Sequence, residues 1–197
     1  ILNIGGISNV TIIKEPLGSN NLISKDLGPG NCLIDTWVRK NSKYKFDVDG
    51  KLAAVGKTND VILEQAQSLF TNRIDKNQIS FDINDFDISF IRGLNLEDGA
   101  ATLTTFTANI ISEELILLQQ NIQKKFNRIL ICGGGRKNKV LLDRIKKNLI
   151  SDIKIQLIDD YNINGDFVES QAFAYLAIRS ILNLPISFPS TTGCDKP

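Results

Sequence analysis

The chain has 197 residues, of which 42% are hydrophobic and 23% charged, and this composition excludes disordered and fibrous proteins. Its net charge of +1 gives no electrostatic reason to expect a nucleic acid or an anionic membrane as a partner. The chain has no histidine, which excludes every site built on that residue. Its three cysteines are far apart and are interpreted as reduced thiols of a cytosolic protein; they are Cys32, Cys132 and Cys194.

Strands are predicted for the first part of the chain. Residues 1–4 and 10–13 are short β-type runs on either side of the segment Gly5–Asn9, and glycines between two such runs are typical of a β-hairpin. A third strand is predicted over residues 21–27, where it meets the turn sequence Gly28-Pro29-Gly30, a strong chain-reversal signal.

Helices are predicted for the middle of the chain from apolar residues at helical spacing. The first begins at about Asn31, with a buried face of Leu33, Ile34, Trp37 and Val38. The second begins at about Asn59, with an inner stripe of Val61, Ile62, Gln65, Ala66 and Leu69. The third runs from Glu97 to about Lys125, with an apolar face near Leu103, Phe106, Ile110, Leu117 and Phe126. Residues 50–56 and 73–96 give no clear prediction.

The last third is predicted to contain a βαβ unit, with a strand over 128–132, a helix over 139–149 and a strand over 153–158. Such a unit requires parallel strands and a right-handed crossover. A final helix over 167–182 is expected to bury Phe173, Leu176, Ala177 and Ile181. The tail from Leu184 is expected to lie on the surface. Together the segments predict an α/β fold, a mixed five-stranded sheet with helices on both faces.

The triple glycine Gly133-Gly134-Gly135 is the first candidate site. Three consecutive glycines cost about 2–3 kcal/mol of backbone entropy, so their presence calls for a reason. The carboxyl end of a parallel strand is where open α/β sheets bind ligands, and the start of the next helix favours anions. The spacing matches neither a dinucleotide fingerprint nor a P-loop. A plain tight turn therefore remains an equal alternative.

Two further candidates are turns near the start of the chain. The hairpin tip at Gly5 and Gly6 could present N–H groups to a phosphate, although an ordinary hairpin is favoured for this segment alone. Asp26, Gly28 and Asn31 could hold a metal or a sugar, and the equal alternative is a turn followed by an asparagine helix cap.

Acidic residues at the start of the last predicted helix form another candidate. Asp166 and Glu169 could carry chemistry, but acidic residues in a first helical turn usually complement the helix dipole, and that alternative is favoured. Cys132 is interpreted as a small buried residue, because the chain has no histidine to activate its thiol.

Taken in chain order, the informative motifs are Asn3-Ile-Gly-Gly-Ile-Ser-Asn-Val-Thr11, Gly28-Pro-Gly-Asn31 with Ile34-Asp35-Thr36-Trp37, Glu97-Asp-Gly-Ala-Ala-Thr-Leu-Thr104, Cys132-Gly-Gly-Gly135 with Asn138, and Val168-Glu-Ser-Gln-Ala-Phe-Ala174. Each motif is weak alone. The series spans nearly the whole chain, and in this order it resembles the anhydro-N-acetylmuramic acid kinase family.

The resemblance implies an actin-like (ribonuclease H-like) ATPase domain, one of two related domains that hold ATP between them. Residues 1–197 would be the single carboxyl-terminal domain, and its partner would be the absent amino-terminal domain. The implied reaction uses ATP and Mg²⁺. It opens the anhydro bridge of 1,6-anhydro-N-acetylmuramic acid with water and phosphorylates the 6-hydroxyl, as a step of peptidoglycan recycling in the cytoplasm.

The resemblance also implies site residues by position. The nucleotide-binding residues would be Gly5, Gly6, Gly133, Gly134, Gly135 and Asn138. The residues facing the substrate cleft would be Asp26, Gly28 and Asn31. Glu169 matches a family glutamate that helps activate water, and no metal ligand is expected from this chain.

The family's catalytic aspartate lies ahead of the Asn-Ile-Gly-Gly hairpin, so turnover is expected to need the amino-terminal half. Two alternatives stay open: a non-catalytic nucleotide-binding remnant of the family, and a related kinase with another small substrate. The oligomeric state, a homodimer included, also stays open.

Overall fold

The structure is a computed structural model that describes residues 1–15, 21–73, 80–149 and 153–195. One five-stranded sheet has the order β3-β2-β1-β4-β5. Its strands are β1 (Leu2–Ile4), β2 (Ile7–Ile13), β3 (Leu22–Pro29), β4 (Arg128–Cys132) and β5 (Lys154–Leu157). Strands β1, β2 and β3 pair antiparallel, whereas β4 pairs parallel with both β1 and β5. The predicted hairpin, the parallel βαβ unit and the mixed five-stranded α/β sheet are confirmed.

The helices, in chain order, are α1 (Cys32–Asn41), α2 (Lys51–Val55), α3 (Asp60–Arg73), α4 (Leu96–Asn121), α5 (Lys139–Asn148), α6 (Val168–Ile181) and α7 (Pro189–Thr192). Short 3₁₀ segments are η2 (Val48–Gly50), η3 (Ile83–Asp85), η4 (Ser89–Ile91), η5 (Gly134–Lys137) and η6 (Ile158–Tyr161). The stretch over residues 50–56, which gave no clear prediction, is therefore largely helical. Within the unclear stretch 73–96, residues 74–79 lie outside the described part of the chain.

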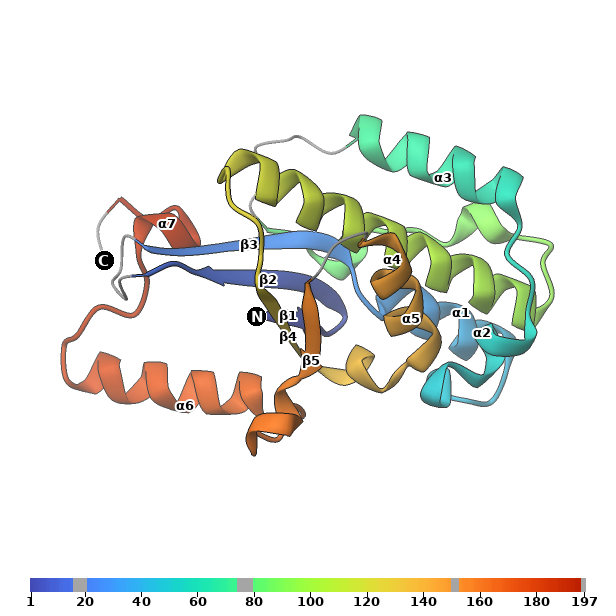
Figure 1. Cartoon of the computed structure of the whole chain (residues 1–197). Coiled ribbons are helices and arrows are strands. Elements are labelled where there is room, and N and C mark those ends of the chain that lie inside the picture. Colours follow the sequence, from blue (N-terminus) through green and yellow to red (C-terminus); the bar gives the residue numbers. More distant parts are fainter. Residues whose placement is uncertain (16–20, 74–79, 150–152, 196–197) are drawn as a thin grey trace.

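Helices α4 and α5 cover one face of the sheet, as Figure 1 shows. Alternate residues of β1 and β2 point to this face, because strand side chains alternate between the two sides of a sheet. They pack with one side of each helix into a core that includes Leu2, Ile4, Val10, Ile12, Ile111, Leu115, Leu141 and Ile145. This core holds the parallel strands β1 and β4 with their carboxyl ends at the same end of the sheet.

A second core joins α1, α2 and α3 to the other side of α4. The four residues predicted to be buried on α1 are all buried. Trp37 donates its indole N–H to the carbonyl of Leu96 at 2.9 Å. Gly99 permits this contact, since a Cβ there would lie 2.2 Å from the Trp37 ring. Helix α4 is thus the central element between the sheet and the outer helices.

The predicted inner stripe of α3 is partly wrong. Val61 and Leu69 are 66% and 57% exposed, whereas Leu63 and Ala66 are buried. Helix α3 packs on its neighbours through one narrow stripe, and its sequence carries apolar residues beyond that stripe. The same holds for Leu117 on α4, which is 48% exposed because it lies on the side of α4 away from both cores.

The predicted burial of α6 is wrong. Phe173 and Ile181 are 65% and 79% exposed, Ala177 is also exposed, and none of the described residues of α6 is buried. Figure 1 shows α6 standing apart from the sheet. The expected tail contains the short helix α7, which lies against β3. Among the described residues, no helix has the length and apolar character needed to cross a membrane.

Candidate functional site

The tip of the β1–β2 hairpin and the turn after β3 meet directly. Gly30 donates its backbone N–H to the carbonyl of Gly6 at 2.9 Å, and Asn31 donates its own to Gly5 at 2.8 Å. A Cβ on Gly30 would lie 2.3 Å from the Gly5 oxygen, so only glycine permits this approach. Two segments that are about 25 residues apart in sequence therefore form one backbone junction.

The Asn31 side chain ties this junction to β1. Its amide donates to the carbonyls of Gly5 at 3.1 Å and Ile4 at 3.3 Å. Asn31 is the N-terminal boundary residue of α1, yet it makes no side-chain capping bond. Asn31 thus occupies the N-cap position, as the alternative predicted, but its side chain holds the hairpin instead of capping the helix.

The triple glycine closes on the same place from β4. Gly133 has φ of +81°, and a Cβ there would lie 2.4 Å from the Asn3 side-chain oxygen. A Cβ on Gly135 would lie 2.3 Å from Ile4, while Gly134 is exposed and faces Asn31. The three glycine segments therefore converge at the carboxyl ends of the parallel strands β1 and β4, where open α/β sheets bind ligands.

A cavity of about 410 Å³ opens beside this convergence, bounded by α1, η2 and η5. It is lined by Asn31, Ile34, Asp35, Phe46, Asp47, Val48, Asp49, Gly134, Lys137 and Asn138. Three of the predicted site residues, Asn31, Gly134 and Asn138, thus line the same cavity. Asn138 is buried and caps α5 by accepting the Leu141 N–H at 3.0 Å.

Asp35 is a cavity residue to which the sequence analysis assigned no role. Burial raises its pKa to about 6, with the Arg39 charge opposing and the Asp47 charge adding to the effect. Asp35 follows Asn31 by four residues, which places both on one face of α1. That spacing was the signal in the sequence that could have identified it.

Asp26 and Gly28 lie on β3, outside the cavity lining. The Asp26 carboxylate accepts the Phe81 N–H at 2.8 Å. Burial raises the pKa of Asp26, and this hydrogen bond opposes the shift. Gly28 has φ of +140°, and a Cβ there would lie 2.9 Å from Ile110. Packing against α4 therefore explains the absence of a side chain at Gly28.

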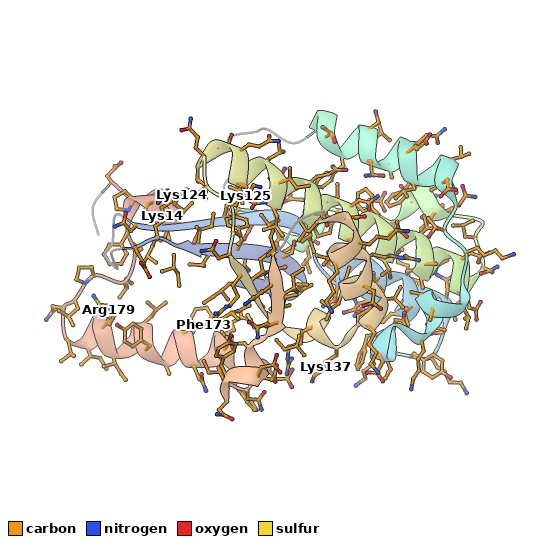
Figure 2. The ribbon with its side chains drawn as sticks, in the orientation of Figure 1. Lys14, Lys124, Lys125, Lys137, Phe173 and Arg179 are labelled. Carbon is orange, nitrogen blue, oxygen red and sulfur yellow. The ribbon has the colours of Figure 1, made fainter. Side chains whose placement is uncertain are left out.

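The two acidic residues near the start of α6 differ. Glu169 is exposed in the first turn and does not line the cavity. Asp166 accepts hydrogen bonds from Arg136 at 2.7 Å and Lys137 at 2.6 Å, and these cations hold the pKa of its carboxyl well below its usual range. Asp166 thus serves an ion-pair network rather than the helix dipole. Figure 2 labels Lys137 at the edge of η5.

Metal and thiol chemistry receive little support from the described residues. Across residues 1–15, 21–73, 80–149 and 153–195, no group of three or more His, Cys, Asp or Glu side chains could hold a metal ion. Cys132 is buried, and burial raises the pKa of its thiol. It is a small core residue, as predicted. Its raised pKa also disfavours the reactive thiolate.

Comparison with known proteins identifies the family to which this chain is similar. A family model described as "Anhydro-N-acetylmuramic acid kinase" matches residues 1–197. A protein of that name from Pelagibacter ubique is 50% identical over 197 residues, which are 100% of this chain and 52% of the relative. Another from Zymomonas mobilis is 38% identical over 199 residues, with coverage of 100% and 52%. The chain spans about half the length of the curated relatives it matches.

Among solved structures, the activator of the 2-hydroxyisocaproyl-CoA dehydratase from Clostridium difficile with bound ADPNP has a TM-score of 0.44 and 15% sequence identity. The match covers 78% of this chain and 52% of that one.

Proposed function

The chain belongs to the anhydro-N-acetylmuramic acid kinase family, and we propose that it is the carboxyl-terminal half of an ATP-dependent sugar kinase. The complete enzyme would convert 1,6-anhydro-N-acetylmuramic acid to N-acetylmuramic acid 6-phosphate. Water would open the anhydro bridge, and the 6-hydroxyl would receive the phosphoryl group. The reaction would recycle peptidoglycan fragments in the cytoplasm.

The convergence of three glycine segments beside one cavity is the observation that carries this proposal. At about 410 Å³, the cavity falls within the range of roughly 300–1,000 Å³ that small-molecule sites occupy. Its wall at Gly134 carries no side chain, so a nucleoside can approach the backbone there. Asn138 and Asn31 supply polar groups to the lining of the same cavity. We assign the adenosine of ATP to this cavity.

The phosphates would extend from the cavity toward the hairpin tip at Gly5 and Gly6, next to Asn31. Phosphoryl transfer depends mainly on positioning and charge stabilisation, and backbone-rich turns are suited to both. Mg²⁺ is held in such sites mostly by phosphate oxygens and one or two carboxylates. A chain without a ready-made acidic cluster among its described residues fits a magnesium ion that arrives with the nucleotide and neutralises its phosphates.

Glu169 is the residue that we propose as general base for the attacking water. This chain has no histidine, and a carboxylate can accept a proton from water without one. Glu169 lies three residues after Asp166, which the Arg136 and Lys137 side chains anchor next to the triple glycine. The exposure of Glu169 suits a group that acts at an interface between two halves.

Helix α6 is the face that we assign to the amino-terminal half. Apolar residues surround the helix, and its polar positions are mainly Glu169, Ser170, Gln171, Arg179 and Ser180. A helix that is apolar on all sides is normally buried, yet α6 has no buried residue among those described. Figure 2 shows its side chains, with Phe173 and Arg179 labelled. The curated relatives are about twice as long, and their additional half is the partner that this helix fits.

The test combines this chain with the amino-terminal half of the Pelagibacter ubique relative. Sugar phosphate formed from the anhydro sugar and ATP is measured by mass spectrometry for each half alone and for the mixture. We expect turnover in the mixture only, and we expect Glu169→Gln to reduce it by about 10²-fold or more. Comparable turnover by this chain alone would refute the need for a second half.

A non-catalytic nucleotide-binding module is the second candidate, because the chain spans only about half of its relatives. Nucleotide binding by the chain, without turnover in any mixture, would favour it. Transfer of phosphate to a different small acceptor in preference to the anhydro sugar would instead favour a related kinase.

A further inference from the structure

Arg136 is a buried cation that the sequence motifs do not single out and whose contact with the triple glycine the proposed mechanism does not use. Its side chain is 6% exposed, although it lies only one residue after the triple glycine. The guanidinium donates to both carboxylate oxygens of Asp159, from Nε at 2.8 Å and from Nη2 at 3.1 Å. Its Nη1 donates to Asp166 at 2.7 Å. This two-point contact with Asp159 is the strongest form of arginine–carboxylate pairing.

The same guanidinium holds the backbone of the triple glycine. Nη1 donates to the carbonyl of Gly133 at 3.0 Å, and the Gly133 N–H donates to the carbonyl of Gly165 at 3.1 Å. A Cβ on Gly165 would lie 2.4 Å from Arg136 Nε, so the side chain lies flat against that glycine. The N–H of Gly133 is therefore held by the segment 159–166, and its carbonyl is held by Arg136.

The network joins two segments that are far apart in the sequence. Arg136 is 23 residues from Asp159 and 30 from Asp166. One segment, 133–138, supplies Gly134 and Asn138 to the cavity wall. The other, 159–166, leads into α6. Asp159 and Asp166 remain 39% and 40% exposed, so the buried partner of both ion pairs is the arginine that touches the glycine loop.

We propose that Arg136 is a positioning residue for nucleotide binding, which holds the Gly133–Gly134 backbone in the conformation that an adenosine contacts. The inference rests on the proposed function, since it assigns the cavity to a nucleoside. A planar guanidinium can satisfy Asp159, Asp166 and the Gly133 carbonyl at once. A lysine at position 136 could reach only part of this set, because an ammonium is a point charge without the fixed fork.

The experiment measures the affinity of the full chain for a fluorescent ADP analogue with Mg²⁺, together with thermal unfolding without nucleotide. The variants are Arg136→Ala, Arg136→Lys and Asp159→Asn. Arg128→Ala is the matched control, because Arg128 also contacts the segment after β5, through the Tyr161 hydroxyl at 2.9 Å, but does not contact the glycine loop. Asp160→Asn is the control for Asp159, since Asp160 accepts only the Leu157 N–H among the described contacts.

We expect Arg136→Ala to weaken binding tenfold or more and Arg136→Lys to weaken it less. Asp159→Asn should weaken it severalfold, and both controls should bind as the unchanged chain does. Asp159→Asn keeps the test decisive if Arg136→Ala does not fold. Equal affinity in Asp159→Asn and Asp160→Asn, or an affinity loss that only follows the loss of thermal stability, would overturn the inference. Absence of binding by the unchanged chain would instead refute the proposed nucleotide site itself.

Discussion

Helices α4 and α6 are both rich in apolar residues, but only α4 is packed. Of its 26 residues, 14 are buried, between the sheet on one side and α1 to α3 on the other. Helix α6 has no buried residue among those described. The difference lies in their partners, since two sides of α4 face other elements of this chain. The two helices therefore separate an apolar surface that this chain buries by itself from one that it leaves exposed.

Helix α4 also supports the candidate site. Thr107 donates its hydroxyl to the carbonyl of Gly30 at 3.3 Å, within the junction formed by the hairpin tip and the turn after β3. Trp37 fixes α1, which carries Asp35, against the start of α4. The floor of the site is thus part of the packed region, whereas Glu169 lies on the helix without packing. Changes on the two helices should consequently have separable effects on stability and on turnover.

The largest expected effect compares one truncation on each helix. Leu103 on α4 is 0% exposed and Ile178 on α6 is 57% exposed. Leu103→Ala should lower the free energy of unfolding by about 2–5 kcal/mol, because it removes buried methyl groups and leaves a cavity. Ile178→Ala should change it by less than about 0.5 kcal/mol. Urea denaturation of this chain alone measures both, and similar losses for the two variants would show that α6 packs within the chain.

The next effect tests the backbone junction above α4. Gly30→Ala would place a Cβ 2.3 Å from the Gly5 oxygen and 3.1 Å from the Gly6 oxygen. Relief of this overlap requires the two turns to separate, at a cost of about 1–3 kcal/mol. Gly6→Ala is the matched control, since its Cβ would have Ile83 as its nearest neighbour at 3.7 Å. Equal melting temperatures for the two variants would contradict the close approach.

A smaller effect is expected at Asp35, on the helix that packs against α4. Burial raises its pKa to about 6, so the folded chain binds a proton more tightly than the unfolded chain. The ionised carboxylate therefore destabilises the fold as pH rises from about 4 to about 6. Asp35→Asn should stabilise the chain at pH 7 by about 1 kcal/mol after solvent screening.

The advantage of Asp35→Asn should vanish below about pH 4, where the carboxyl is protonated in both states. Asp143→Asn, at an exposed position on α5, is the control. Thermal unfolding between pH 4 and pH 7 measures the difference. A gain for Asp35→Asn that is the same at both ends of this range would show that burial does not control the group.

The difference between α4 and α6 also marks the limit of prediction from sequence. Residues 128–132 and 139–149 were predicted nearly to their ends, because the strand is a short apolar run and the helix has one clear apolar stripe. The glycine motifs indicated which turns meet beside the cavity. The predicted burial of the apolar residues of α6 relied on the rule that such residues are buried. That rule does not say whether the surface that covers them belongs to the same chain. The Arg136 network joins residues 23 and 30 positions apart, and no local pattern encodes such a meeting.

The smallest expected effect tests whether ion pairing, rather than apolar burial, holds α4 in the packed region. Lys25 on β3 and Glu114 on α4 form an ion pair at 2.9 Å, with side chains 29% and 24% exposed. Water still reaches both groups, so a double-mutant cycle with Lys25→Ala and Glu114→Ala should give a coupling of about 0.5 kcal/mol. Added salt should reduce it further by screening. A coupling as large as the loss from Leu103→Ala would mean that ion pairing, which α6 lacks toward the sheet among the described contacts, holds α4 in place. A small coupling leaves apolar burial as the cause of the difference between the two helices.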